Sequence, residues 1–357
     1  MGRSPRQMVR VPRVLIAGGY GVFGCLLAAE LLQTTDAEVV IAGRDLAKAN
    51  AACRDLDLRA SGRVEPRRID LSRPGELREA AGDCVAVACT AGPFQALPTE
   101  LVGEAVEAGA HWVDIADASG WVLGILQDSE LDERARAAGV AVGTGLSTLP
   151  ALSGVLARWL IERVPQARTA TVVLAIGNRN RKGSAAIASA LMSGMRDPSR
   201  VETPLGPRSS FRIDSPDEQL LASEGLEATC RVALESAIAR RIALLARSGK
   251  QGRDPGEVMG RSRLLARASS FWRFGGSGGC VQVEVRDARG FGAAAAFVGS
   301  DQTMAILPAA IVVKRLLDGS TRFEGVVRPT DWIPVADSIA ELRRRGIRTV
   351  SRNVLRR

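Results

Sequence analysis

The feature that most constrains this chain is a glycine-rich turn close to its start. A short apolar run over residues 13–17 leads into Gly18-Gly19-Tyr20-Gly21-Val22-Phe23-Gly24, and a helical pattern follows. In the spacing Gly19-x-Gly21-x-x-Gly24, the first glycine allows a tight turn, the second lets the backbone approach a pyrophosphate, and the third lets the helix pack on the strand. The helix N-terminus also favours an anion. This context predicts a dinucleotide site that uses Gly19, Tyr20, Gly21, Val22, Phe23 and Gly24.

A second apolar run, residues 38–43, indicates which dinucleotide is bound. An NAD site usually places an acidic residue on the ribose about twenty residues after the glycines, whereas Arg44 follows this run. A guanidinium can hold a 2′-phosphate through two hydrogen bonds, so Arg44 favours NADP. The alternative is that Arg44 only caps a turn and that Asp45 binds the ribose. Asp45 is also a suitable N-cap for a helix that starts at Leu46.

Composition limits the classes of protein to consider. The chain has 357 residues and is 46% hydrophobic, which favours two domains over one, and we find no uninterrupted apolar segment of membrane-spanning length. Six scattered cysteines and a single histidine argue against a metal site. The net charge is +9, but no aromatic residues interleave with the basic C-terminal run, so we expect neither a nucleic-acid nor a membrane partner. We expect a cytoplasmic enzyme.

The pattern of elements predicts the fold class. Strand and helix signals alternate from residue 13 to 145, which is typical of an α/β protein with a Rossmann-type, doubly wound parallel sheet. Asp70 follows the third strand and is either an adenine contact or the N-cap of the next helix. We expect the Rossmann domain over residues 1–148, a second α+β domain for substrate and dimer contacts over 149–300, and a C-terminal helix and tail over 301–357 that return to the first domain.

Within the second domain the expected strands are 171–176, 280–286 and 293–298, the last two as a hairpin. The expected helices, the last of them beyond that domain, are 152–161, 185–195, 226–248 and 305–317, and the expected loops are 197–217 and 249–262.

Several motifs occur in the order seen in saccharopine dehydrogenase-like reductases. They are the glycine turn, Ala42-Gly43-Arg44, Thr90-Ala91-Gly92-Pro93-Phe94-Gln95, the run from Ala108 to Asp117, and Gly299-x-x-x-Thr303. The chain resembles this family strongly over about residues 13–150 and diffusely beyond them. The resemblance implies an NADP-binding Rossmann domain, a homodimer, and the reduction of an imine formed from an amine and a carbonyl compound.

Few residues are suited to assist such a reaction. The cofactor supplies the hydride, and the protein positions and polarises the substrate. Asp114 and Asp117 end the fifth strand, where doubly wound sheets form a ligand crevice, although both could simply cap a turn. His111 opens that strand and is either catalytic or a packed structural residue. Thr90, Ala91 and Gly92 follow the fourth strand and are expected beside the nicotinamide, unless they form an ordinary strand–helix connection.

Two further groups are candidates for the substrate side. Ser147 and Thr148 lie where the chain leaves the first domain, and therefore at the expected cleft. Arg179, Arg181 and Lys182 could clamp a substrate carboxylate, or could form a solvated turn.

The sequence therefore predicts an NADP-dependent oxidoreductase that acts on a small molecule, with imine reduction as the specific hypothesis. One alternative is a reductase of a C=C or C=O bond in an apolar substrate. Another is a non-catalytic NADP-binding sensor or scaffold protein, because histidine, tyrosine and lysine are scarce.

Overall fold

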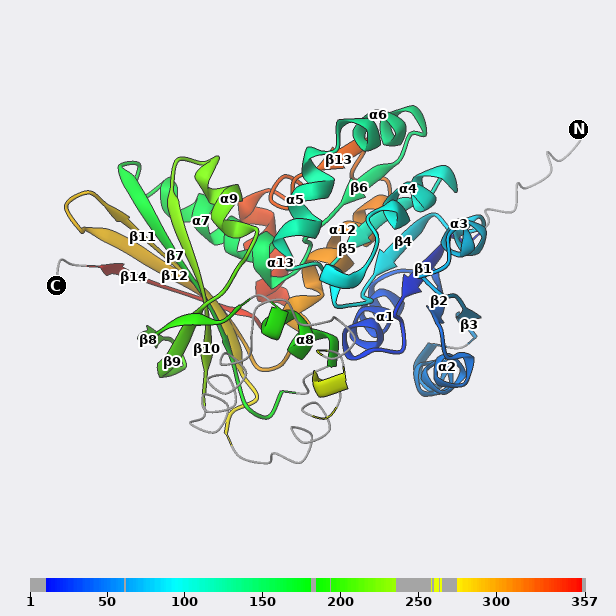
Figure 1. The fold of residues 1–357 in the computed structure, drawn as a ribbon, viewed down its shortest axis with the longest axis horizontal. Coiled ribbons are helices and arrows are strands. Elements are labelled where there is room, and N and C mark those ends of the chain that lie inside the picture. The colour runs from blue at the N-terminus through cyan, green and yellow to red at the C-terminus, as the bar shows by residue number, and fades with distance from the viewer. Residues whose placement is uncertain are drawn as a thin grey trace, which may run out of the picture.

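A computed structural model of the chain describes residues 11–60, 62–180, 184–192, 194–235, 258, 260–262, 264 and 275–354. It contains two seven-stranded sheets, which lie on opposite sides of the molecule with helices between and around them (Figure 1). We call the sheet that contains the glycine turn sheet A and the other sheet B. The described chain starts next to β1 of sheet A and ends with β14, at the edge of sheet B.

Sheet A is parallel throughout. Its strands are β1 (Arg13–Ala17), β2 (Glu38–Gly43), β3 (Val64–Arg68), β4 (Ala86–Cys89), β5 (His111–Asp114), β6 (Ala141–Gly143) and β13 (Gly325–Val327). Their order is β13-β6-β5-β4-β1-β2-β3, so the direction of winding reverses at β1, between β2 and β4. The prediction of a doubly wound, Rossmann-type sheet is confirmed, and the reversal marks where such sheets bind ligands.

Helices cover both faces of sheet A. They are α1 (Val22–Thr34), α2 (Leu46–Ala60), α3 (Glu76–Ala81), α4 (Glu100–Glu107), α5 (Ser119–Gln127), α6 (Ser129–Ala137) and α12 (Leu307–Leu317). Helix α1 contacts α2 and α12, whereas α4 contacts α3 and α6. The two groups lie on opposite faces because right-handed crossovers that run in opposite directions place their helices on opposite faces.

Sheet B is mixed. Its strands are β7 (Ala167–Ile176), β8 (Arg196–Thr203), β9 (Gly206–Arg212), β10 (Glu227–Leu234), β11 (Gly279–Asp287), β12 (Gly292–Gly299) and β14 (Arg348–Val354). Their order is β14-β12-β11-β7-β10-β9-β8, in which β10 and β7 pair in parallel and the other neighbours pair antiparallel. The expected hairpin of residues 280–286 and 293–298 is present as β11 and β12.

The two faces of sheet B belong to different clusters. Val281, Val283 and Val285 are fully buried in the main core, with α7 (Ser153–Ile161) packed against β11. Cys280 points to the other face, where it forms a separate small cluster. The remaining described helices of this half are α8 (Ser184–Met192), α9 (Asp217–Ala222) and α13 (Val335–Arg344).

Two expectations for the second domain are wrong. Residues 197–217, expected as a loop, form most of the β8–β9 hairpin and the start of α9, and the hairpin turns at Gly206 with a φ of +92°. Residues 226–248, expected as a helix, begin with β10. The remainder of that range and most of residues 249–262 lie outside the described residues.

The C-terminal segment divides between the sheets. Helix α12 packs on β4, β5 and α1, and β13 joins sheet A beside β6. Residues 348–354, expected as part of a tail, instead form β14 at the edge of sheet B.

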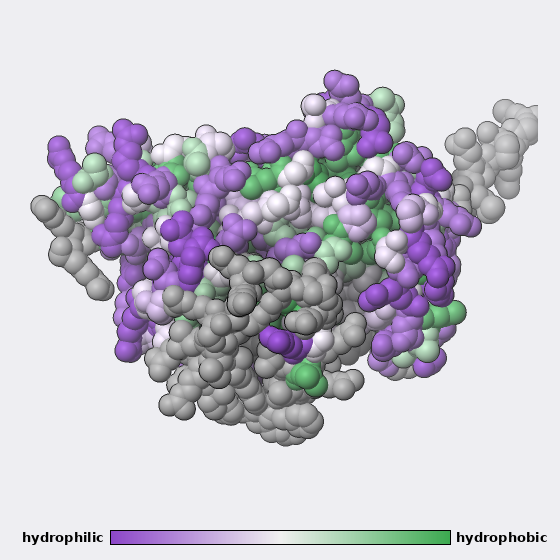
Figure 2. All heavy atoms as spheres, viewed as in Figure 1, coloured by the Kyte–Doolittle hydropathy of each residue, from purple (hydrophilic) through white to green (hydrophobic). Residues whose placement is uncertain are grey.

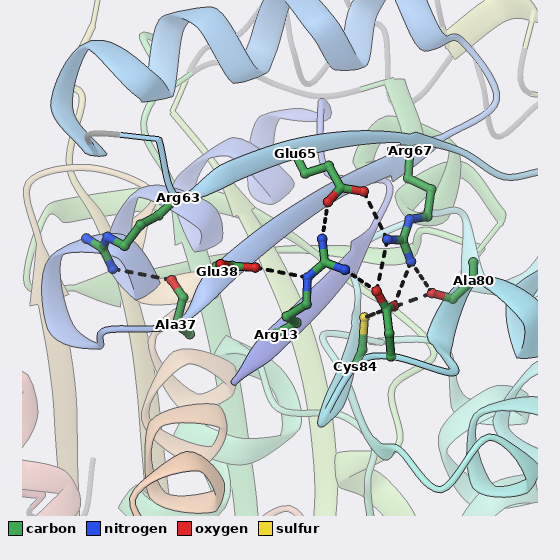
Figure 3. A network of polar contacts seen from close by, with 9 residues as sticks. Arg13, Ala37, Glu38, Arg63, Glu65, Arg67, Ala80 and Cys84 are labelled. Atoms are coloured by element: carbon green, nitrogen blue, oxygen red, sulfur yellow. Dashed lines mark hydrogen bonds and ion pairs between the residues drawn. The ribbon is translucent and has the colours of Figure 1, made fainter. Parts of the chain in front are cut away.

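An ion-pair network holds the amino ends of the first strands of sheet A (Figure 3). Arg13 at the start of β1 pairs with Glu38, Glu65 and Asp83. Arg67 of β3 pairs with Asp83 at 2.9 Å and with Glu65 at 3.0 Å. The Arg67 guanidinium lowers the pKa of Asp83 well below its usual range. The network lies away from the glycine turn, which is at the carboxyl ends of the strands. It therefore stabilises sheet A without occupying the end of the strands where a ligand is expected.

The described surface is largely polar on the face shown in Figure 2. Hydrophilic side chains gather over both outer ends of the molecule, and hydrophobic ones show mainly in the middle. The helices in the part of the chain that the structure describes are all too short or too polar to cross a bilayer. Among the same residues, no three histidine, cysteine or acidic side chains cluster as metal ligands would.

Candidate functional site

The glycine turn connects β1 to α1 and packs against Ala91, the residue that follows Thr90. Gly18 has a φ of +79°, and a Cβ added there would lie 2.7 Å from the backbone nitrogen of Ala91. A Cβ on Gly24 would lie 2.4 Å from the carbonyl oxygen of Gly18. These close approaches need glycine, because a side chain would push the helix and the loop away from the strand. The left-handed residue of the turn is therefore Gly18, one position before the glycine expected to make it.

The N-terminus of α1 is arranged for an anion. Gly21 is its N-cap residue, and among the described residues no side-chain hydrogen bond caps this end of the helix. A Cβ on Gly21 would meet only the carbonyl oxygen of Gly18, at 3.0 Å, among the protein atoms within 4 Å. The first N–H groups of a helix have no partner within the helix. The turn thus fits a pyrophosphate, with Val22 and Phe23 following in the first turn of α1.

Tyr20 connects the turn to the end of β2. A Cβ on Gly43 would lie 2.5 Å from Cε1 of Tyr20, so the ring occupies the space above Gly43. The Tyr20 hydroxyl accepts a hydrogen bond from the backbone N–H of Asp45 at 3.4 Å. The Asp45 carboxylate in turn accepts from the N–H of Lys48 at 3.1 Å and pairs with its Nζ at 2.9 Å. Asp45 is therefore the N-cap of α2.

Arg44 and Asp70 lie near each other beyond the ends of β2 and β3. Arg44 is exposed, and its charge is one of the causes that lower the pKa of Asp70, after the hydrogen bonds from Ser72. One Asp70 oxygen accepts from the Ser72 N–H at 3.1 Å and from its hydroxyl at 2.8 Å. Asp70 thus closes a local turn, while the Arg44 side chain is exposed at the edge where a 2′-phosphate is expected. Both cofactor roles stay predictions.

A cavity of about 200 Å³ lies between the two domains, beside the glycine turn. From the first domain, Phe23, Thr90, Gly92, Ile115 and Asp117 line it. From the second domain, it is lined by residues that are mostly apolar: Leu174, Ala175, Ile176, Ala190, Ile213 and Val232. Ser147 and Thr148 also line it, as expected from their place at the domain boundary. Since Phe23 belongs to the turn, a cofactor at the turn would lie next to this cavity.

Asp117 is the carboxylate that β5 brings to the cavity. Its oxygen Oδ1 accepts a hydrogen bond from the Ser189 hydroxyl of α8 at 2.9 Å, and Ser189 accepts one from Gln95 Nε2 at 3.0 Å. The side chain keeps accessible surface because it faces the cavity. Protein surrounds the carboxylate on its other sides, and this desolvation raises the pKa of Asp117.

Asp114 lies in the core of the first domain, which corrects the expectation that it faces the cleft. It is 1% exposed, and its carboxylate accepts hydrogen bonds from five donors at 2.9–3.1 Å. The donors are Trp112 Nε1, Trp121 Nε1, the Thr144 hydroxyl and the N–H groups of Ala116 and Gly145. Burial raises its pKa, against the effect of these donors. Asp114 ties β5 to α5 and to the residues after β6.

His111 also lies away from the cavity. It starts β5, at the end of the strand opposite the glycine turn, and its Nδ1 accepts a hydrogen bond from the N–H of Ala141 at 2.9 Å. Burial lowers its pKa, so the ring stays neutral near pH 7. These contacts are those of a structural residue that joins β5 to β6, and they correct the expectation of a catalytic place for His111.

The remaining candidates fall on both sides of the cavity. Thr90 donates from its hydroxyl to the carbonyl of Ala17 at 3.1 Å and, with Gly92, lines the cavity, while Ala91 packs on Gly18. Arg179 is exposed and is not a lining residue. Arg181 and Lys182 lie outside the described residues.

Sequence reasoning missed several polar residues that line the cavity, among them Ser189, Asp214 and Asp301, and it also missed Gln95, which donates a hydrogen bond to Ser189. Only Asp301 carried a recognisable signal, because an Asp two residues before a Thr typically caps a turn. Its oxygen accepts from the N–H of Thr303 at 2.9 Å and from the Thr303 hydroxyl at 2.6 Å.

Comparisons with known proteins agree with this geometry. Residues 14–142 match the family model described as the saccharopine dehydrogenase NADP binding domain. Among solved structures, the chain is similar to apo saccharopine dehydrogenase (L-Glu forming) from Saccharomyces cerevisiae, with a TM-score of 0.62, 13% identity, and coverage of 96% of this chain and 100% of that one. It is also similar to GenD2 from gentamicin A biosynthesis in complex with NAD, with a TM-score of 0.42, 15% identity, and coverage of 99% and 100%. The first likeness shows the fold, and the family match supports NADP as the cofactor.

Proposed function

We propose that this chain, whose first domain is a saccharopine dehydrogenase-like NADP-binding domain, reduces a C=N bond formed from an amine and a carbonyl compound. The observation that carries the proposal is the cavity between the two domains. Phe23 of the glycine turn and Asp117 at the end of β5 both line it, so one chamber adjoins the cofactor turn and contains a carboxylate. Such a chamber suits a substrate that becomes cationic during the reaction.

The residues of the chain have distinct parts in this proposal. The glycine turn would hold the pyrophosphate, and Arg44 the 2′-phosphate. When bound, NADPH supplies a hydride. The apolar walls would lower the dielectric beside Asp117, which would strengthen the interaction between its carboxylate and a positively charged nitrogen. Ser189 and Gln95 orient Asp117 through the two hydrogen bonds described above.

A second candidate function has one observation in its favour. The cavity walls are largely apolar, and apolar walls also suit a C=C or C=O bond in an apolar substrate. A single measurement, NADPH oxidation with different classes of substrate, separates both hypotheses from a sensor or scaffold that binds NADP without turnover.

The test is NADPH oxidation, followed by absorbance, with a panel of amine–carbonyl pairs, ketones and enoyl compounds. We expect turnover only when an amine and a carbonyl compound are present together. Gly21→Val is the control that removes cofactor binding, because a branched side chain would occupy the place of the pyrophosphate. Turnover of ketones or enoyl compounds alone would contradict imine reduction, and NADPH binding without any turnover would favour a sensor.

A homodimer and a cytoplasmic location belong to the same proposal. They rest on the family resemblance and on composition, respectively. Sedimentation velocity of the purified chain and fractionation of the cells that produce it test them.

A further inference from the structure

We infer that the cavity selects a substrate whose reacting end is a cationic nitrogen on an apolar body of about six carbons, without a carboxylate, and that Asp117 holds this nitrogen. The inference rests on the proposed function and names its substrate class. The substrate would be a simple aliphatic or aromatic amine rather than an amino acid.

The first argument is the charge of the cavity. Three carboxylates line it, on Asp117, Asp214 and Asp301, and none of the described lining residues is an arginine, lysine or histidine. Charges interact more strongly next to apolar walls than in water. No guanidinium of the described residues lines the cavity to receive a substrate carboxylate, so the three aspartates would repel it, whereas they would attract an ammonium group.

The second argument is the distribution of partners among the three carboxylates. Asp301 accepts two hydrogen bonds from Thr303, so it closes a turn. All three side chains keep accessible surface, but Asp117 is the one that lies on the first-domain side of the cavity, as Thr90 and Gly92 do. Asp117 accepts a side-chain hydrogen bond from Ser189 on one oxygen, and no arginine or lysine among the described residues forms an ion pair with it. A partly desolvated carboxylate is stabilised by a cation or by further donors beside it, and a bound ammonium would supply both.

The third argument is the size and character of the walls. Leu174, Ile176 and Val232 of sheet B line the cavity together with Phe94 and Ile115 of the first domain, and all five offer apolar contacts. A cavity of about 150 Å³ can hold benzene, so the cavity of about 200 Å³ has room for a six-carbon body. Burial of such a body stabilises the complex by the hydrophobic effect, and the carboxylate fixes which end points to Asp117.

The experiment compares three probes of equal length, hexylamine, hexanol and hexanoate, by calorimetric titration of the full chain with and without NADPH. We expect hexylamine to bind at least about tenfold more tightly than either other probe, since a hydrogen bond to a charged group is worth about that much. Asp117→Asn should remove this preference. Asp36→Asn makes the same charge change at an exposed position far from the cavity and should keep it.

Asp117→Glu is the second variant, because it keeps a carboxylate at the same place and should keep at least part of the preference for hexylamine. If Asp117→Asn fails to fold, Asp117→Ser removes the carboxylate in its place and should likewise abolish the preference. Equal binding of hexylamine and hexanol, or tighter binding of hexanoate, would overturn the inference. Neither result would touch the proposed function, which fails separately if NADPH does not bind in the same titration or if no amine–carbonyl pair is reduced.

Discussion

Asp114 and Asp117 lie three residues apart, but their carboxylates have opposite surroundings. Five donors surround Asp114 in the core, whereas Asp117 faces the cavity and receives one side-chain hydrogen bond, from Ser189. Desolvation raises the pKa of both. The donors around Asp114 hold parts of the first domain together, and the accessible side of Asp117 is available to a ligand.

Asp114→Asn should destabilise the protein while leaving the cavity residues in place. An amide replaces one acceptor oxygen with an NH₂ group, so a donor would then face the indole N–H groups or the Thr144 and Gly145 donors. Leaving such buried donors without an acceptor costs about 1–3 kcal/mol. We expect a loss of this size in urea unfolding. Unchanged stability together with lost turnover would contradict the structural role.

Arg44→Ala should weaken NADPH binding much more than NADH binding. The guanidinium is exposed beside Asp70, and hydrogen bonds to the 2′-phosphate would each be worth roughly 1.5–3 kcal/mol, or at least about tenfold in affinity. Fluorescence titration of both cofactors measures the difference. Asp36→Asn, an exposed change away from the turn, is the control. Equal losses for NADPH and NADH would show that Arg44 has only a structural role.

The sequence located the strand end that carries these residues but not their orientations. The run from Trp112 to Asp117 indicates a strand followed by a turn, and both aspartates fit that turn. Two indoles donate to Asp114, that of Trp112 from β5 itself and that of Trp121 from α5. The Ser189 hydroxyl that donates to Asp117 comes from the other domain. The Trp121 and Ser189 partners are brought to the aspartates by the packing of other elements, so they could not be read from local spacing.

At the scale of elements, the carboxyl ends and the amino ends of the strands of sheet A have different roles. The carboxyl ends of β1, β4 and β5 lead into the glycine turn and the cavity, while charged residues pair at the amino ends of β1 to β4 (Figure 3).

Arg67→Met should lower the stability of the folded chain in a pH-dependent manner. The Arg67 guanidinium lowers the pKa of Asp83, so ionised Asp83 stabilises the fold above the ordinary Asp pKa, and this stabilisation is lost as the pH falls through the lowered value. We expect a loss of roughly 1–2 kcal/mol at pH 7 and a smaller loss at pH 3, from urea unfolding at both values. Arg73→Met removes an exposed guanidinium that pairs only at 3.4 Å and serves as the control. An equal loss at both pH values for Arg67→Met would refute the role of Asp83.

Most strands of sheet A were predictable because they are buried apolar runs, and part of sheet B was not because it is exposed. Strand β13 (Gly325–Val327) of sheet A was not predicted, since three residues leave too short a pattern. Strands β1 and β2 are apolar runs with almost every residue buried. Strand β8 has no buried residue, so it pairs with β9 without leaving an alternating apolar pattern in the sequence. Strand β10 does alternate, but two of its buried positions are the small residues Ala228 and Cys230, which also fit a helix.

At the scale of the whole molecule, the C-terminal segment joins the two halves. Helix α12 packs on β4 and β5, β13 completes one edge of sheet A, and β14 completes one edge of sheet B (Figure 1). Met304 and Ala305, just before α12, line the cavity, and the Ser147 hydroxyl donates to the Ala305 carbonyl at 2.8 Å. The cavity is therefore lined by segments that range from Phe23 to Ala305 and come from both domains, although the cofactor turn belongs to the first domain alone.

This division predicts that substrate and cofactor binding can be separated by one change in the second domain. Ala190 of α8 lines the cavity, so the indole of Ala190→Trp should fill much of its 200 Å³ and reduce hexylamine binding at least about tenfold. The affinity for NADPH should stay within about twofold of the wild type, because the turn, α1 and Arg44 all lie in sheet A and its connections. Ala137→Trp, an exposed change at the end of α6, is the matched control and should affect neither ligand. Parallel titrations with NADPH and hexylamine make the comparison. If Ala190→Trp weakened both ligands equally in a protein that unfolds at the wild-type temperature, the cavity would be part of the cofactor site rather than the chamber beside it.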